Sequence, residues 1–158
     1  MSFDASDTEH IMRLAHSLLQ VNVPSIPDDT IYRTAIGRAY YACFLTARDR
    51  LFPGRDGPSR SQQRTFPAVQ GSHLRIAAAL AANRKLSAGA KGKRLKDQLE
   101  ALMHARTAAD YHKDSDQLVI DVFQNSGGAT NWRECAVEQI SQALMLHREL
   151  MVIPAFEV

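Results

Sequence analysis

The sequence predicts an all-α fold, and three observations support this class. Apolar residues recur at helical spacing in most segments, capping sequences rich in Ser, Asp and Asn precede these runs, and prolines or glycines end them. The 158 residues suit one domain with a real core. We therefore expect residues 1–158 to form a single up-and-down bundle of about five helices, with its core over residues 6–151.

The first two helices have clear boundaries in the sequence. The first is expected to start at Ser6, where Ser-Asp-Thr-Glu forms a capping box, and to end before Pro24. The second is expected to use residues 28–30 as N-caps and to run to about Leu51. Its predicted core face holds Ile36, Tyr40, Phe44, Ala47 and Leu51.

The rest of the chain reads as three helices separated by two polar loops. Residues 52–71 hold three prolines and are expected to form a long basic loop. The remaining helices are expected at 72–86, 91–112 and 131–151, with a loop at 113–130 that holds a short extended piece at 118–120. The last helix starts with the capping-box-like Asn131-Trp-Arg-Glu. Its predicted apolar side holds Val137, Ile140, Leu144, His147 and Met151.

The composition, 45% apolar and 23% charged, is typical of a water-soluble globular protein. No apolar run approaches the ~20 residues of a membrane span, and no signal-peptide core is present, so we expect a cytoplasmic protein without a membrane partner. Cys43 and Cys135 are expected to be buried free thiols. Metal-ligand spacings are absent, as are the motifs for phosphate loops, dinucleotides and serine hydrolases. We therefore predict no metal and no cofactor.

Charge is unevenly distributed along the chain although the net charge is only +2. Residues 1–47 carry −2, residues 48–96 carry +10 from twelve basic and two acidic side chains, and residues 97–158 carry −6. A middle third this basic indicates a surface for a polyanion such as RNA or a nucleotide. Alternatively, it balances the acidic C-terminal third, within the molecule or across a dimer.

An arginine and an aspartate interrupt the apolar stripe of the fourth predicted helix. Counted at about 100° per residue from Leu95, Arg106 points within about 20° of this stripe and Asp110 within about 60°. Their i,i+4 spacing predicts an ion pair. One interpretation is a half-buried pair that fixes this helix on the second. The other is an arginine oriented by its aspartate to bind phosphate.

His112 follows Arg106 by six residues, or about 240° around a straight helix. The two side chains can meet only if the helix ends near Asp110 and the chain turns back, or if the partner comes from another subunit. A histidine acting as general acid–base beside an arginine that stabilises the transition state suits RNA cleavage by 2′-OH attack. The alternative is a solvent-exposed histidine at a helix end.

Further candidate contacts to a substrate come from the second helix and the basic loop. Tyr41 lies off the core face and could line a cleft with Arg38, although tyrosines at helical spacing are more often core residues. Arg60 and Arg64 belong to the basic loop, and loops of this length are usually functional or disordered. His73, at a helix start beside this loop, has a weaker claim.

Two segments resemble a known family. Tyr32–Phe44, with the sequence Y-R-T-A-I-G-R-A-Y-Y-A-C-F, resembles the second-helix signature of HEPN domains, often written S-R-A-Y-Y-A. Arg106–Tyr111, with the sequence R-T-A-A-D-Y, resembles the R-x-x-A-D-Y variant of many members. The resemblance covers about residues 6–150. It implies a helical bundle that is usually a two-fold dimer, with a polar cleft near the dimer interface.

The resemblance also implies functional residues. The R-x(4–6)-H pattern of the family matches Arg106 and His112, with Asp110 in the turn between them, and these three are the predicted catalytic residues. Tyr111 is expected to contact the substrate beside them, together with Arg38 and Tyr41. A two-fold dimer would bring Arg106 of one subunit to His112 of the other.

Three functional hypotheses follow. The first is a metal-independent endoribonuclease in a toxin–antitoxin or defence context. The second is a non-catalytic module that binds RNA or a nucleotide. The third is a dimeric adaptor, for instance the partner of a nucleotidyltransferase or of a cognate antitoxin. Cleavage in EDTA that requires Arg106 and His112 would indicate the first, salt-sensitive RNA binding the second, and tight association with another protein the third.

Overall fold

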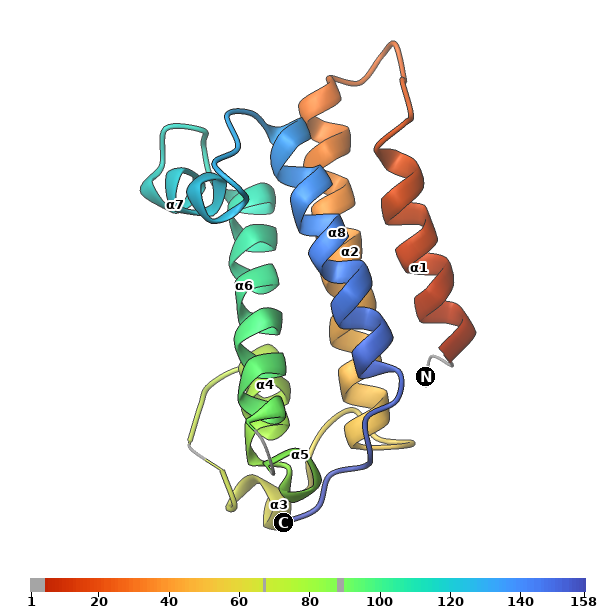
Figure 1. The fold of residues 1–158 in the computed structure, drawn as a ribbon, viewed down its shortest axis with the longest axis vertical. Helices are drawn as coiled ribbons and strands as arrows, with labels where there is room; N and C mark the ends of the chain where they lie inside the picture. The colour runs from red at the N-terminus through yellow and green to blue at the C-terminus, as the bar shows by residue number, and fades with distance from the viewer. Residues whose placement is uncertain (1–4, 67, 88–89) are drawn as a thin grey trace.

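In the computed structural model, which describes residues 5–66, 68–87 and 90–158, four long helices lie side by side (Figure 1). They are α1 (Ala5–Leu18), α2 (Asp28–Leu51), α6 (Lys91–Tyr111) and α8 (Trp132–Leu150). The other elements are α4 (Ser72–Ala82) and three shorter helices, α3 (Arg60–Gln63), α5 (Arg84–Ser87) and α7 (Gln117–Asn125). Within the described ranges there are eight helices and no strand. This confirms the all-α prediction, with more helices than the five expected.

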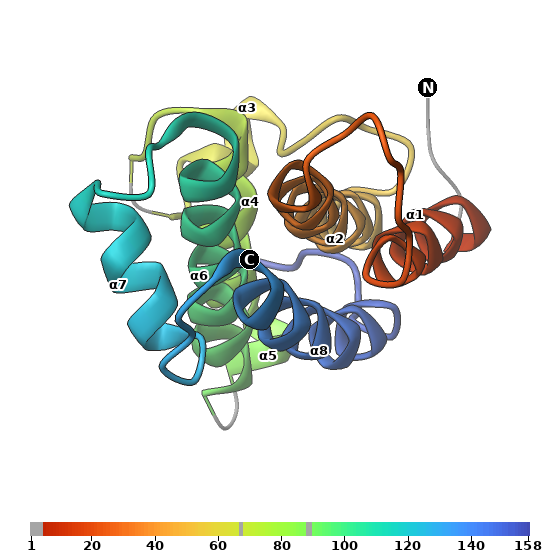
Figure 2. The same ribbon diagram turned by 90° about the horizontal axis from the view of Figure 1, so that it is seen from above.

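Helix α2 is the centre of the arrangement. It packs against α1, α8, α6 and α4, and the view from above in Figure 2 shows α1 and α6 on opposite sides of it. All five residues of its predicted core face are at most 6% exposed, which confirms that prediction. Burial of each large apolar side chain contributes roughly 1.5–3 kcal/mol to stability. The partners of α2 therefore fix its orientation, and with it the side chains that it presents to α6.

The starts of the first two helices differ from the predicted caps. Helix α2 begins at Asp28 after Pro27, and no side chain caps it. The Thr30 N–H donates instead to the Pro27 carbonyl at 3.0 Å. Aspartates in this first turn still favour the helix through its dipole. Helix α1 begins at Ala5, so Ser6 is inside the helix and is not its N-cap.

The start of α8 confirms one half of the predicted capping box. The Glu134 N–H donates to Asn131 Oδ1 at 2.9 Å, whereas the Glu134 carboxylate accepts from the Thr130 N–H and hydroxyl and not from the Asn131 backbone N–H that a capping box requires. The predicted apolar side is partly wrong, because Val137 is 50% exposed. The buried side of α8 is instead rotated towards Cys135, Gln139, Ala143, Leu146 and Leu150.

A short helix interrupts the predicted loop at 52–71, of which residue 67 lies outside the described part. Ser59 and Gln62 form a full capping box for α3. Ser59 Oγ accepts from the Gln62 N–H at 3.2 Å, and Gln62 Oε1 accepts from the Ser59 N–H at 2.9 Å. The sequence Ser-x-x-Gln is typical of such a helix start, but the prolines on either side of it led to the prediction of a loop.

The predicted extended piece at 118–120 is wrong, because these residues belong to α7. Val119 and Val122, one helical turn apart, are both buried. The Ser126 hydroxyl donates to the Val122 carbonyl at 2.6 Å and closes the last turn of the helix. The run Leu-Val-Ile suggested a strand because Val and Ile favour strands. Burial of Val119 and Val122, at positions i and i+3, instead matches a helix.

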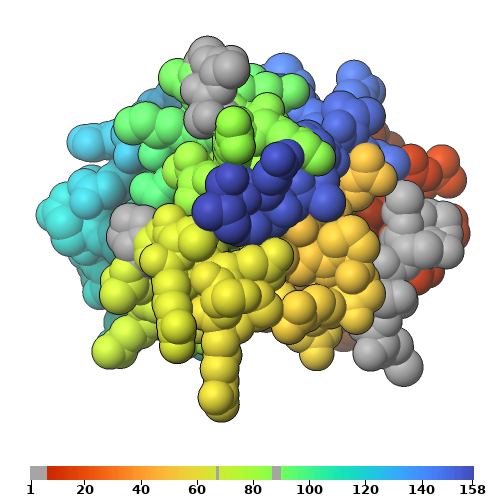
Figure 3. All heavy atoms as spheres, turned by 90° about the horizontal axis from the view of Figure 1, so that it is seen from below, coloured from red at the N-terminus to blue at the C-terminus, as the bar shows by residue number. Residues whose placement is uncertain are grey.

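The predicted helix at 72–86 breaks at Asn83, where α4 ends and α5 follows. Asn83 is fully buried. Its Oδ1 accepts from the N–H groups of Lys85 and Glu157, and its Nδ2 donates to the Pro154 carbonyl at 3.3 Å. The C-terminal segment therefore lies across the lower end of the bundle, where Figure 3 shows it in blue beside the yellow 52–71 segment.

Both cysteines are free and buried, as predicted. Cys43 Sγ donates to the Ala143 carbonyl at 3.4 Å, and burial raises the pKa of this thiol. Among the described helices, none has the length and apolar character needed to cross a membrane.

Candidate functional site

Arg106, Asp110, Tyr41 and Tyr111 lie along the line where α2 and α6 pack in opposite directions. Tyr41 and Arg33, two turns apart on α2, meet successive positions of α6. Arg106 Nη2 donates to Tyr41 Oη at 3.2 Å, and Arg33 Nη2 donates to the His112 carbonyl at 3.1 Å. Between them, Asp110 packs over Gly37, where an added Cβ would lie 3.5 Å from Asp110 Oδ1. We call this line, from Tyr41 and Arg106 to Arg33 and His112, the α2–α6 seam.

Contacts on several sides hold the Arg106 side chain in the seam. Its Nε lies 2.9 Å from Asp110 Oδ2, so the ion pair predicted from the sequence is present. The N–H is not aligned for a hydrogen bond, which leaves the buried Nε without a hydrogen-bond partner. The guanidinium carbon lies 5.3 Å from the ring centre of Tyr41 and 5.4 Å from that of Tyr111. Two cation–π contacts and one carboxylate therefore fix the guanidinium.

This arrangement leaves several donors free for a ligand. Nη2 donates to the hydroxyls of Tyr41 and, at 3.4 Å, Tyr111. Since each hydroxyl accepts from Arg106, its own proton remains available. Nη1 of Arg106 has no hydrogen bond to a described residue, and the side chain is 16% exposed. The Tyr111 ring is 71% exposed. The group can therefore offer one guanidinium edge and two hydroxyl protons to an anion beside an open aromatic face.

The structure brings together four of the eight predicted site residues, namely Arg106, Asp110, Tyr41 and Tyr111. Arg38 lies on α2 one turn before Tyr41; it is exposed and has no ion pair with any described residue. Because Arg38 points into solvent, it could contact a ligand only from outside the α2–α6 seam.

His112 does not join Arg106 within the subunit. Helix α6 ends at Tyr111, but the chain then turns towards α7 rather than back. The His112 ring places Nδ1 3.1 Å from Asp116 Oδ2. Of the two routes by which His112 could meet Arg106, the structure therefore shows no contact within the subunit. A pairing between subunits stays a prediction.

The segment after His112 is fixed by a cluster that the sequence did not reveal. Arg33 Nη2 lies 2.6 Å from Asp114 Oδ1, and the Trp132 indole N–H donates to the same oxygen at 2.9 Å. The guanidinium of Arg33 also stacks 4.5 Å above the Trp132 ring. This cluster links α2 and α8 to the residues that follow α6, and Arg33 also holds the His112 carbonyl.

A different histidine lies beside Tyr41. The ring of His73, in the first turn of α4, stacks on Phe44 with centres 4.3 Å apart, and its centre lies 6.2 Å from that of Tyr41. His73 Nδ1 and Tyr40 Oη are 2.5 Å apart. Burial, followed by the positive charge of Arg106, lowers the pKa of His73 below its ordinary value of 6.5. The imidazole is therefore neutral at pH 7.

Arg60 and Arg64 do not belong to this site. Both are exposed and belong to α3 and its C-cap, beneath the lower end of α6 in Figure 1. Arg106 lies in the upper part of α6, fifteen residues or about 22 Å from Lys91. The basic middle third of the sequence is therefore spread over the molecule. Only a ligand as long as a nucleic acid strand can contact both ends.

No family model matches this chain, and neither a curated protein nor a solved structure matches it. The resemblance to HEPN domains therefore remains a prediction from two motifs. Among the side chains that the structure describes, no group of three or more His, Cys, Asp or Glu is placed to hold a metal ion.

The two histidines with lowered pKa values predict how stability depends on pH. Burial lowers the pKa of His147, which faces Thr8, and that of His73. The unfolded chain binds protons at the ordinary value of 6.5, before the native state does. The free energy of unfolding should therefore fall as the pH drops from about 7 to 5, by at most about 1.4 kcal/mol per pH unit for each histidine.

Urea unfolding at pH 7, 6 and 5 measures this dependence. We expect His73→Gln and His147→Gln each to reduce the slope, and the double variant to remove most of it. An unchanged slope in the double variant would show that other groups cause the dependence.

Proposed function

We propose that the protein binds single-stranded RNA at the α2–α6 seam, with a backbone phosphate on Arg106 and a base on Tyr111. The observation that carries this proposal is the guanidinium held between two tyrosines, with one edge and two hydroxyl protons free. Guanidinium groups match phosphate oxygens, and exposed aromatic rings stack on unpaired bases. Sequence-independent RNA binding requires both features in one place.

Tyr111 tests this proposal with little risk to the fold, because its ring is 71% exposed. Stacking of one base is worth about 1–3 kcal/mol, so Tyr111→Ala should weaken binding of a labelled RNA oligomer by roughly tenfold or more. Tyr111→Phe keeps the ring and loses only the hydroxyl, and it should retain most of the affinity. Fluorescence anisotropy in EDTA measures both.

The salt dependence is the second readout of the same experiment. The logarithm of the affinity should fall linearly with the logarithm of the salt concentration, because phosphate contacts release counterions. Binding that does not respond to salt, or a Tyr111→Ala variant that binds as well as wild type, would contradict the proposal. DNA of the same sequence tests whether the 2′-hydroxyl contributes.

A second candidate function, metal-independent RNA cleavage, is favoured by His73. A phosphate on Arg106 would lie beside Tyr41, and the His73 ring also contacts the Tyr41 ring, with centres 6.2 Å apart. When Nδ1–H of the neutral imidazole donates to Tyr40 Oη, Nε2 is free to accept a proton. Nε2 could then take the proton of a 2′-hydroxyl, whose oxygen attacks phosphorus as the bond to the 5′-oxygen breaks. The leaving 5′-oxygen takes a proton from water, and the imidazolium returns its own proton to the hydroxide that is left. The products are a 2′,3′-cyclic phosphate and a 5′-hydroxyl.

Incubation of RNA in EDTA with two histidine variants tests this candidate. We expect His73→Gln to abolish cleavage and His112→Gln to retain it. The reverse result would favour the R-x(4–6)-H assignment, with His112 supplied by a second subunit. Absence of cleavage by wild type, with binding intact, would leave the RNA-binding function and exclude the nuclease.

A further inference from the structure

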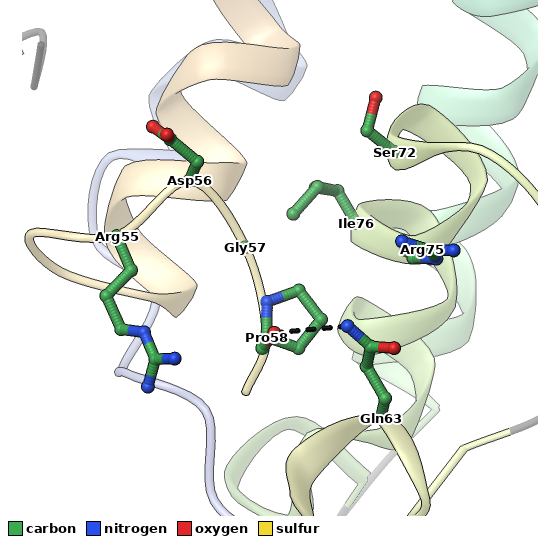
Figure 4. A pocket seen from close by; sticks show the side chains of 8 residues that line it. All are labelled: Arg55, Asp56, Gly57, Pro58, Gln63, Ser72, Arg75 and Ile76. Atoms are coloured by element: carbon green, nitrogen blue, oxygen red, sulfur yellow. Dashed lines mark hydrogen bonds between the residues drawn. The ribbon is translucent and has the colours of Figure 1, made fainter. Parts of the chain in front are cut away.

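A hollow of about 290 Å³ lies between the start of α4 and the segment that follows α2. Figure 4 shows Ile76 directed from α4 towards the Gly57–Pro58 segment, with Arg55 along one rim and Arg75 on the opposite side. Gln63 closes the lower side and donates from Nε2 to the Pro58 carbonyl at 3.2 Å. The hollow thus combines an apolar floor with two arginines, at the lower end of the sizes of ligand pockets.

The charge of this hollow is positive and uncompensated. Neither Arg55 nor Arg75 forms an ion pair or side-chain hydrogen bond with a described residue, whereas Arg48 and Arg94 of the same middle segment pair with Asp49 and Glu149. The one acid in the lining, Asp56, is 88% exposed and lies 4.0 Å from Arg48. No side chain caps the first turn of α4, so its free N–H groups add to the positive potential.

The first turn of α4 lies between the hollow and the α2–α6 seam. Ser72 and Arg75 line the hollow, while His73, between them in sequence, packs against Phe44 and Tyr41. Tyr41 in turn contacts Arg106. Steps of 5.3 Å and 6.2 Å, from Arg106 to the Tyr41 ring and from there to the His73 ring, therefore connect the two places. A strand that is bound at Arg106 and passes over Tyr41 and His73 would continue to the hollow.

We infer that this hollow is a second phosphate-binding subsite, which takes a backbone phosphate of the same RNA strand that binds at Arg106. The inference rests on the proposed RNA binding and adds the direction of the strand, from Tyr111 over Tyr41 and His73 to Arg55 and Arg75. It also explains why the basic charge of the middle third continues beyond the seam.

The length dependence of RNA binding tests the subsite. In the Arg55→Gln/Arg75→Gln double variant, oligomers of two to three nucleotides should bind as to wild type. Oligomers of ten nucleotides should bind about tenfold more weakly, with the salt slope reduced by about 0.7 because one phosphate contact is lost. The matched control is Arg13→Gln/Arg133→Gln, which removes the same charge from exposed positions on α1 and α8. The loss of affinity in this control should be less than half of the loss in the Arg55→Gln/Arg75→Gln variant.

The possible outcomes separate the two proposals. If the double variant matches its control while Arg106→Gln weakens binding, the subsite is wrong and RNA binding at the seam stands. If wild type binds no RNA, both proposals are wrong. Inorganic phosphate is the last probe. It could raise the melting temperature of wild type but not of the double variant, while long RNA binds both proteins equally. That result would show that the hollow takes free phosphate and no RNA phosphate.

Discussion

Replacing Arg106 with glutamine is expected to reduce the affinity for RNA by at least about tenfold, with the fold retained. A charge-assisted hydrogen bond contributes roughly 1.5–3 kcal/mol, and tenfold corresponds to about 1.4 kcal/mol. The loss should exceed that of any single surface arginine, because Asp110 and the two tyrosines hold this guanidinium in one orientation. Anisotropy with a labelled RNA oligomer measures the affinity, and circular dichroism checks the fold.

Arg106→Lys separates charge from geometry. Lysine keeps the positive charge but cannot contact two hydroxyls and a phosphate at once with a planar group. We expect Arg106→Lys to keep the salt slope of wild type but to bind RNA with an affinity close to that of Arg106→Gln. A lysine variant that binds like wild type would mean that only the charge of this position matters, and the oriented phosphate site would be wrong.

Arg13→Gln is the matched control for both variants. Arg13 is exposed on α1, which packs against α2 and α8 and not against α6. It removes one positive charge far from the seam and should change the affinity less than threefold, roughly the effect of one screened surface charge. Equal losses in Arg13→Gln and Arg106→Gln would indicate diffuse attraction of RNA to the whole surface.

Gly92→Ala is expected to destabilise the protein much more than the same substitution at Gly37, the other described glycine inside a helix. A Cβ at Gly92 would lie 2.3 Å from the carbonyl oxygen of Leu80 and 3.2 Å from Leu86 Cβ. Because the first contact is with backbone, no side-chain rotation relieves it, and α4 and α6 must move apart. Overpacking of this kind costs about 1–3 kcal/mol, and we expect the upper end of this range in urea unfolding.

Gly37→Ala is the matched control on the neighbouring helix. Its Cβ would meet Asp110 Oδ1 at 3.5 Å, an ordinary contact. Alanine in a helix interior is more stable than glycine by roughly 0.5–1 kcal/mol, so stability should stay equal or rise. A Gly37→Ala variant as unstable as Gly92→Ala would show that the close approach of α4 and α6 is not what glycine provides at residue 92.

The sequence predicted the long helices well, because their signals are local. Periodic apolar residues and the proline at residue 27 placed α2 almost to the residue, and Asn131 marked the start of α8. The failures came where distant segments decide the outcome. Asn83 ends α4 because it binds the C-terminal segment, more than 70 residues later in the chain.

The candidate site shows the same division. The Arg106–Asp110 ion pair follows from i,i+4 spacing on one helix and is present. The neighbourhood of His73 depends on how α4 packs against α2, and no spacing within the sequence shows that Tyr40 and His73 meet. The sequence signal for His73 was its place at a helix start, which is common. Arg60 and Arg64 were grouped with the site by charge alone, and charge does not specify position.

The contact of the C-terminal segment with α2 has a consequence during synthesis. The Phe156 N–H donates to the Leu51 carbonyl, and the Phe156 ring packs against Phe52 and Phe66. These partners emerge from the ribosome about 100 residues earlier, which is roughly 5–20 s at ordinary rates of translation. Throughout this interval the nascent chain carries two uncovered phenylalanines. We expect a chaperone that recognises exposed aromatic residues to bind it there, and to leave only when Phe156 arrives.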